Sequence, residues 1–224
     1  MAVGVKYPPK SGFMFTKVLP GDAQECLAIL GKTNTLPKGT YLAGGTALAL
    51  HFGHRISVDL DFFIPKSFHQ PTLSFELKKL GKYTEDRVAD DTLLWAYGQT
   101  HCSLFRYSYP VIFPTHDFLG IPILDPREIG AMKIGAVMNR GTKKDFVDLY
   151  ELSYYQNISL DSCLEIYREK YGNFESGVYS FLLGLSYFVE TETTEMPKMF
   201  RKVDWGQIKK YFSGETIRLK KKYM

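Results

Sequence analysis

Two different spacings of apolar residues divide the chain into an α/β part and a helical part. Apolar positions three and four residues apart indicate a first helix from about Asp22 to Leu30, which Gly31 ends. Short runs rich in aromatic and β-branched residues then alternate with two further helices, near 46–52 and 71–80. The predicted strands are residues 40–43, 57–64, 82–88, 93–97 and 102–107, with extended pieces at 111–113 and 121–124.

The pattern changes at Asp125, beyond which every segment has helical spacing. The predicted helices are 126–140, 143–155, 161–171, 175–189 and 204–212, with a polar linker at 190–197. We therefore predict an α+β protein. Residues 1–124 form an α/β core with a small mixed sheet and an N-terminal helix, and residues 125–224 form an all-helical C-terminal lobe.

The composition is that of a folded globular protein, with 45% apolar residues, 23% charged residues and a net charge of +4 in 224 residues. This excludes a disordered chain, a collagen-like chain and a disulfide framework. The three cysteines have no zinc-ligand spacing, so we expect buried thiols in a reducing compartment. No run approaches the ~18 apolar residues of a membrane span. The N-terminus lacks a signal pattern, so we expect a cytoplasmic protein without membrane contact.

The most informative segment begins where a predicted strand gives way to a helix, at Gly44-Gly45-Thr46. Glycines let the backbone approach a ligand closely, and the N–H groups at a helix start attract phosphate. Taken alone, this pattern is more typical of a plain tight turn between a strand and a helix.

A pair of carboxylates follows shortly afterwards. Asp59 and Asp61 are two positions apart on a predicted strand, so both side chains face one side, while Val58, Leu60 and Phe62 face the core. Neighbouring carboxylates repel each other, and a shared divalent cation removes the repulsion. A single D-x-D is commonly a solvated strand face, but together with the glycine turn it favours a site for Mg²⁺ and phosphate.

Two predicted helices of the lobe supply further candidates. Lys133 and Arg140 fall within the apolar stripe of helix 126–140, where a cation needs a negative partner such as a triphosphate or the acidic pair. The alternative is that each stem is buried while its charged head reaches solvent. In the next helix Asp145 has capping-box spacing from Thr142, and Asp148 could be an ordinary exposed carboxylate.

Two other features carry less information. His51 and His54 lack further ligands at metal-binding spacing, so packed or capped side chains are the favoured interpretation. The basic tail around Arg218 and 220–222 is more typical of a solvated helix end than of a contact to a phosphate backbone.

Taken in order, these blocks resemble the AbiEii/AbiGii-type nucleotidyltransferase toxin family, within the DNA polymerase β-like nucleotidyltransferases. The motifs are Gly-Gly-Thr, then Arg-x-Ser-x-Asp-Leu-Asp-Phe, and much later Lys133, Arg140 and Lys-Asp-x-x-Asp-Leu-Tyr. The resemblance implies a polymerase β-like core and transfer of an NMP from an NTP to an acceptor hydroxyl, with release of pyrophosphate. It also implies the toxin of a toxin–antitoxin or abortive-infection pair, with the 3′ end of tRNA as acceptor and an antitoxin protein as partner.

The resemblance also implies roles for individual residues. Asp59 and Asp61 would be catalytic and would hold two Mg²⁺ ions, Lys133 would neutralise triphosphate charge, and Asp148 would be the further acidic site residue. Asp148 matches that family position better than Asp145 does. The implied nucleotide-binding set is Gly44, Gly45, Thr46, Arg55, Ser57, Arg140 and Asp145.

Two other functions stay open, and a third is disfavoured. The acceptor could be a small molecule or a protein hydroxyl. The chain could also bind nucleotide without turnover, because many superfamily enzymes place a third metal carboxylate on a later strand, and residues 102–107 offer none. Either a helix aspartate replaces it or the second metal is held weakly. A D-x-D phosphohydrolase is disfavoured, since Phe63 stands where such enzymes usually carry Thr or Val.

Overall fold

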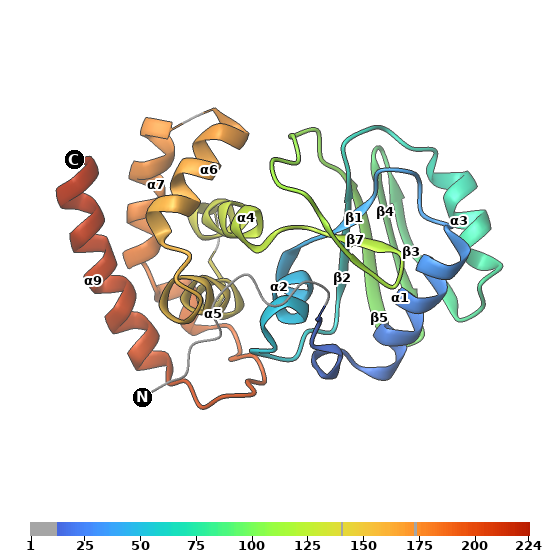
Figure 1. The fold of residues 1–224 in the computed structure, drawn as a ribbon, viewed down its shortest axis with the longest axis horizontal. Coiled ribbons are helices and arrows are strands. Elements are labelled where there is room, and N and C mark those ends of the chain that lie inside the picture. The colour runs from blue at the N-terminus through green and yellow to red at the C-terminus, as the bar shows by residue number, and fades with distance from the viewer. Residues whose placement is uncertain (1–12, 140, 173) are drawn as a thin grey trace. The chain divides into compact units, whose positions relative to one another are not determined.

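The computed structural model describes residues 13–139, 141–172 and 174–224, and it confirms the predicted α+β fold class. The contacts group into two compact units, one ending at Asp125 and the other beginning at Pro126 (Figure 1). None of the helices in the described part of the chain combines the length and the apolar composition that crossing a bilayer requires.

The first unit is built on a mixed seven-stranded sheet with the strand order β3-β4-β5-β2-β1-β7-β6. β2 runs parallel to β5, β1 runs parallel to β7, and the other neighbours are antiparallel. The strands are β1 (Tyr41–Leu42), β2 (Leu60–Ile64), β3 (Tyr83–Ala89), β4 (Thr92–Tyr97), β5 (Thr100–Arg106), β6 (His116–Phe118) and β7 (Ile121–Ile123).

Alternation along β2 separates a core face of the sheet from a more open face. Leu60 and Phe62 are buried, whereas Asp61 and Phe63 are half-buried. The ring of Phe62 stacks on that of Trp95 at a centroid distance of 6.2 Å. Because successive side chains of a strand point to opposite faces, the apolar residues build the core and Asp61 is left accessible.

Helices pack on the core face of this sheet (Figure 1). They are α1 (Gly21–Thr33) and α3 (Gln70–Lys78), while α2 (Gly44–Phe52) follows β1, and a short 3₁₀ turn, η1 (Thr16–Val18), precedes α1. The Sγ atoms of Cys26 in α1 and Cys102 in β5 lie 3.9 Å apart, which places α1 on this face.

Four local predictions for this unit were wrong. The strand predicted at 57–64 begins only at Leu60, and Val58, which was predicted to face the core, lies before it and is 43% exposed. Gly31 does not end α1, which continues to Thr33. Gly31 is needed because a Cβ there would lie 1.8 Å from the carbonyl oxygen of Leu119. β5 begins at Thr100, so His101 belongs to the strand and not to the hairpin turn. Residues 111–113 form no strand, while the unpredicted β6 lies shortly after them.

The second unit is helical throughout, with α4 (Pro126–Asn139) packed against three other helices. These are α5 (Lys143–Tyr150), α6 (Leu160–Tyr171) and α7 (Phe174–Ser186); η2 (Glu151–Tyr155), α8 (Val189–Glu192) and α9 (Trp205–Tyr223) complete the unit. Its largest fully buried rings are those of Tyr150, Phe146, Phe181 and Phe212. Gly184 permits the close approach of α7 to α4, because a Cβ there would lie 2.5 Å from the carbonyl oxygen of Val137.

The basic tail is part of α9, which runs well beyond the predicted end of that helix. Arg218 forms an ion pair with Asp161 of α6, and Nζ of Lys222 lies 2.6 Å from the same carboxylate. These contacts and the exposed residues around them agree with a solvated helix end. His51 and His54 are buried, as expected for packed side chains.

Candidate active site

Asp61 and Asp59 lie at the start of β2, on the open face of the sheet. Asp61 is the second residue of the strand, and Asp59 precedes it. The parallel register pairs Asp61 with Ser103 of β5, whose hydroxyl donates a 2.8 Å hydrogen bond to Oδ1 of Asp61. One oxygen of the carboxylate is therefore held in place by the neighbouring strand.

The start of α2 lies directly beside this carboxylate. Gly44 has a φ of +68°, and a Cβ at this position would lie 3.1 Å from Oδ2 of Asp61. The N–H of Ala43 donates a 3.0 Å hydrogen bond to the carbonyl oxygen of Asp61. Helix geometry leaves the N–H groups of Gly44, Gly45 and Thr46 without acceptors in a preceding turn. The structure thus brings the glycine turn and Asp61 together, beside N–H groups suited to an anion.

The side chains of Thr46, Ser57 and Arg55 form a buried network next to the acidic pair. The hydroxyl of Thr46 donates a hydrogen bond of 2.8 Å to Oγ of Ser57 and also bonds to the carbonyl oxygen of Asp59. Nη1 of Arg55 donates to the carbonyl oxygen of Ile56 at 3.0 Å and to Oγ of Ser57 at 3.2 Å.

All three side chains are less than a tenth exposed. Sequence reasoning assigned Thr46, Arg55 and Ser57 to nucleotide binding. In the structure these side chains connect α2 to the segment that carries Asp59, and their part in nucleotide binding stays a prediction.

A hollow of about 190 Å³ opens beside the acidic pair. Its lining is Asp59, Asp61, Asp86, Leu94, His101, Cys102 and Ser103. Nδ1 of His101 lies 3.6 Å from Oδ2 of Asp86. Sequence reasoning missed both residues, because His101 was assigned to a turn and Asp86 lies on a strand without any motif. The sequence offered one indication for His101. It lies two positions before Ser103 and therefore on the same face of a strand as the residue that pairs with Asp61.

Two carboxylates fit a magnesium ion that also binds substrate phosphates. Mg²⁺ is typically held by one or two protein carboxylates together with phosphate oxygens and water. Within residues 13–139, 141–172 and 174–224, no group of three or more His, Cys, Asp or Glu side chains forms a metal cage. The donors Asp59 and Asp61, beside the helix start, therefore suit a metal that arrives with a nucleotide.

The second group of predicted residues lies within the helical unit. Nζ of Lys133 in α4 is 2.8 Å from Oδ1 of Asp145 and 2.8 Å from Oδ2 of Asp148, both in α5. Asp148 is completely buried, so it is not the exposed helical carboxylate of the simpler interpretation. Lys133 therefore finds its negative partners in the following helix.

Asp145 forms the capping box that its spacing from Thr142 predicted. Its Oδ2 accepts hydrogen bonds from the backbone N–H and the hydroxyl of Thr142 at 3.0 and 2.7 Å, which confirms the capping box. Burial raises the pKa of the Asp145 carboxyl, but Lys133 and the bonds from Thr142 outweigh burial, so the pKa lies below its usual value. Arg140, the remaining predicted residue, lies outside the described residues.

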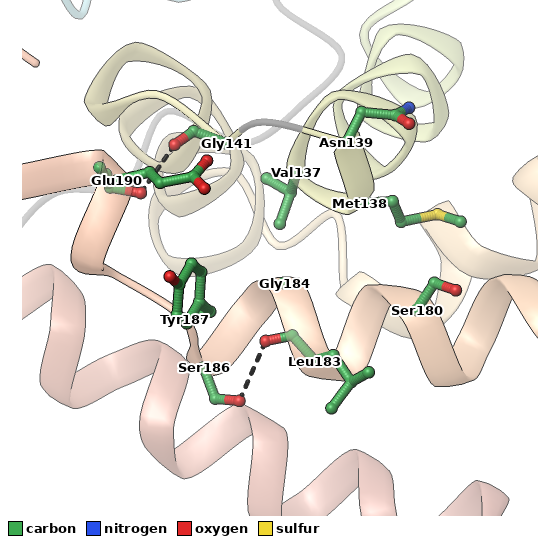
Figure 2. A pocket seen from close by; sticks show the side chains of 11 residues that line it. Val137, Met138, Asn139, Gly141, Ser180, Leu183, Gly184, Ser186, Tyr187 and Glu190 are labelled. Atoms are coloured by element: carbon green, nitrogen blue, oxygen red, sulfur yellow. Dashed lines mark hydrogen bonds between the residues drawn. The ribbon is translucent and has the colours of Figure 1, made fainter.

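A larger hollow of about 590 Å³ belongs to the helical unit (Figure 2). Its lining mixes small, apolar and polar residues from the end of α4, from α7 and from the segment after α7. Figure 2 shows Ser186 bonded back to the carbonyl of Leu183, with Tyr187 beside them. None of the carboxylates predicted for catalysis lines this hollow, so it carries no assigned chemistry.

The sequence is similar to a known protein family and to one other protein over most of its length. Residues 29–93 match the model of a family described as nucleotidyl transferase AbiEii toxin, Type IV TA system. This range contains the glycine turn and both aspartates of the acidic pair. A protein of Aquifex aeolicus (strain VF5), named uncharacterized protein aq_aa25, is 30% identical over 201 residues, covering 87% of this chain and 93% of that protein. The chain belongs to the AbiEii nucleotidyltransferase toxin family.

Solved structures share the fold of this AbiEii-family protein at low sequence identity. MenT4, a nucleotidyltransferase toxin from Mycobacterium tuberculosis H37Rv, is 14% identical with a TM-score of 0.56. The match covers 88% of this chain and 85% of MenT4. JHP933 from Helicobacter pylori is 19% identical with a TM-score of 0.54, covering 92% and 94% of the two chains. By its family, the chain is a nucleotidyltransferase whose substrate is an NTP and whose role is that of a toxin.

Proposed function

We propose that this AbiEii-family toxin is a Mg²⁺-dependent enzyme that transfers an NMP to the 3′ end of tRNA and that an antitoxin protein restrains it. The observation that carries the proposal is the position of Gly44 against Asp61, with a Cβ at Gly44 only 3.1 Å from Oδ2. It sets a phosphate-binding helix start beside a metal-binding carboxylate, which is what a magnesium–triphosphate requires.

The proposed reaction is a displacement at the α-phosphorus of the NTP. The acceptor hydroxyl oxygen forms a bond to this phosphorus, the bond to the bridging oxygen of the β-phosphate breaks, and pyrophosphate leaves with the electron pair. The hydroxyl proton passes to a base in the same step, for which solvent water suffices. Mg²⁺, when bound to Asp59 and Asp61, would polarise the phosphate and offset the charge that develops on the leaving group.

The chain's own groups have distinct proposed roles. Backbone N–H groups of Gly44, Gly45 and Thr46 bind phosphate oxygens, and the Ser103 hydroxyl keeps Asp61 oriented. The resemblance assigns Lys133 to the charge of the triphosphate, and within its own helical unit the ammonium group is held by Asp145 and Asp148. We assign Asp148 to the reaction through Lys133, because the carboxylate is buried and paired with that residue.

The proposal is tested by supplying each α-³²P-labelled NTP with Mg²⁺ and pooled tRNA and separating the products by size. We expect label from one or two of the NTPs in the tRNA band, and none with Asp59→Asn. Label in small molecules or in protein would overturn the tRNA assignment while keeping nucleotidyl transfer. Absence of label from every product would overturn the catalytic proposal.

A second candidate function is nucleotide binding without turnover. It is supported by residues 102–107, which include most of the strand beside Asp61 and contain no third carboxylate. Mg²⁺-dependent NTP binding without any release of pyrophosphate would favour this function over transfer.

A further inference from the structure

The hollow beside the acidic pair contains a histidine that the proposed function does not yet use. The parallel register pairs Leu60 with Cys102 and Asp61 with Ser103. His101 therefore lies one position before the paired part of β5, on the strand that neighbours Asp59. Alternation along β5 places His101 on the same open face of the sheet as Ser103 and Asp61.

Asp86 is placed so that it orients the His101 ring. It lies in β3 at a register shift between Glu85 and Arg87, an irregularity of the kind that redirects a side chain. Its Oδ2 is 3.6 Å from Nδ1 of His101. A carboxylate facing Nδ1 favours the tautomer with the proton on Nδ1, so that Nε2 carries a lone pair. The His101 side chain is 74% exposed, which leaves it accessible to a large acceptor.

Other groups in the described part of the chain are less suited to receive a proton from the acceptor. Asp145 and Asp148 both contact the Lys133 ammonium, and for Asp145 this contact and the bonds from Thr142 hold the pKa of the carboxyl below its usual value. Cys102 lines the hollow, but the neighbouring Cys26 thiol and burial raise the pKa of its thiol and keep it protonated. Ser103 already donates its hydroxyl proton to Asp61.

We propose that His101, oriented by Asp86, binds the acceptor hydroxyl in this hollow. The inference rests on the proposed nucleotidyl transfer. Nε2 accepts a hydrogen bond from the hydroxyl, which directs an oxygen lone pair toward the α-phosphorus. As the new bond between oxygen and phosphorus forms, the proton moves to Nε2 and pyrophosphate leaves with the electrons of the broken bond.

The test uses the full chain with His101→Asn, His101→Gln and Asp86→Asn, and His69→Asn as a matched control. His69 is an exposed histidine at the start of α3, where Asn keeps the side-chain cap. Each variant is assayed for transfer of ³²P from the preferred NTP to pooled tRNA. The dissociation constant for a fluorescent analogue of that NTP is measured with Mg²⁺, and thermal melting reports folding.

We expect His101→Asn to lower kcat by about 10²- to 10³-fold, which is typical for loss of a general acid–base group. Nucleotide affinity should stay within about 2-fold, since the group acts on the acceptor. His101→Gln restores a hydrogen-bond acceptor near the position of Nε2. It should therefore position the acceptor hydroxyl better than His101→Asn does, and its KM for tRNA should be lower than that of His101→Asn. Asp86→Asn should cost about 10-fold in kcat, and His69→Asn should resemble wild type.

Two results would overturn the inference: a His101→Asn variant with wild-type kcat, or one that loses nucleotide affinity as much as Asp59→Asn does. The second result would make His101 part of the metal and nucleotide site. Wild-type protein that transfers no label would instead contradict the proposed function itself, so the two failures are distinguishable.

Discussion

The hydroxyl of Ser103 donates a 2.8 Å hydrogen bond to Oδ1 of Asp61 across the parallel pair β2 and β5. The bond leaves the other carboxylate oxygen, Oδ2, on the side of Gly44. The orientation of the Asp61 carboxylate is therefore shared between a neighbouring strand and the start of a helix.

Ser103→Ala should weaken metal binding more than it slows the reaction at saturating metal. Loss of a group that orients a metal ligand typically costs about 10-fold or more in metal affinity. The Mg²⁺ concentration for half-maximal transfer should rise by about 10-fold, with little change in kcat at saturation. Ser108→Ala, at an exposed position just after β5, is the control. An unchanged Mg²⁺ titration of Ser103→Ala would argue against the proposed role.

Gly44→Ala should abolish most activity because the added Cβ displaces Asp61. The left-handed backbone adds a strain of about 1–2 kcal/mol. Gly81→Ala separates the two effects, since Gly81 has a φ of +74° but nothing within 4 Å of an added Cβ. Both variants should lose similar stability in urea unfolding, while only Gly44→Ala should lose NTP transfer. Equal activity in the two variants would count against the contact with Asp61.

The helical unit contains a fully buried ion pair between Lys170 of α6 and Glu128 of α4, with Nζ 2.5 Å from Oε1. Lys170→Met removes one partner of a buried carboxylate, at a typical cost of about 3–5 kcal/mol in unfolding free energy. Adding Glu128→Leu should recover most of that loss, because an apolar pair of similar volume packs in the same space. Chemical denaturation measures both. A double variant as unstable as Lys170→Met would refute this account.

The stability of the first unit should fall between pH 6.5 and about 4 because of His51. Burial lowers the pKa of His51 from 6.5 to about 4, and its Nε2 lies 3.0 Å from the carbonyl oxygen of Leu124. In this range the unfolded chain binds a proton that the folded chain does not bind. The unfolding free energy therefore decreases as the pH falls, by about 3 kcal/mol across the window.

His51→Gln tests this pH dependence, because its amide can still donate to Leu124 and has no titratable group. Comparing unfolding free energies of the two proteins at several pH values cancels the contribution of other carboxylates and histidines. The variant should show the shallower decrease on acidification. Parallel pH curves would mean that His51 does not carry the effect.

Much of the fold could be predicted because its patterns are local. The alternation around Asp61 identified β2 and its two faces, and the apolar spacing beyond Asp125 indicated the helical unit. Gly31 misled because glycine commonly ends helices, whereas here it allows the loop at Leu119 to approach α1. Such tertiary contacts leave no trace in the spacing of neighbouring residues.

The candidate site was predictable only in part for the same reason. The Gly44 and Asp61 motifs lie close in sequence, and the structure brings them together. His101 lies on β5 and Asp86 on β3, on either side of β4, and local patterns do not reveal that their side chains come close. The negative partners of Lys133 also depended on the packing of two helices, although Asp145 and Asp148 were singled out beforehand.

The central claim is that Asp59 and Asp61, beside the start of α2, bind an NTP together with Mg²⁺. Equilibrium binding of a fluorescent NTP analogue tests it most directly, with wild type, Asp59→Asn and Asp61→Asn measured in Mg²⁺ and in EDTA. The account predicts tight binding by wild type only with Mg²⁺, and a loss of at least about 10-fold in each variant. Binding that is indifferent to Mg²⁺, or that survives in both variants, would contradict it.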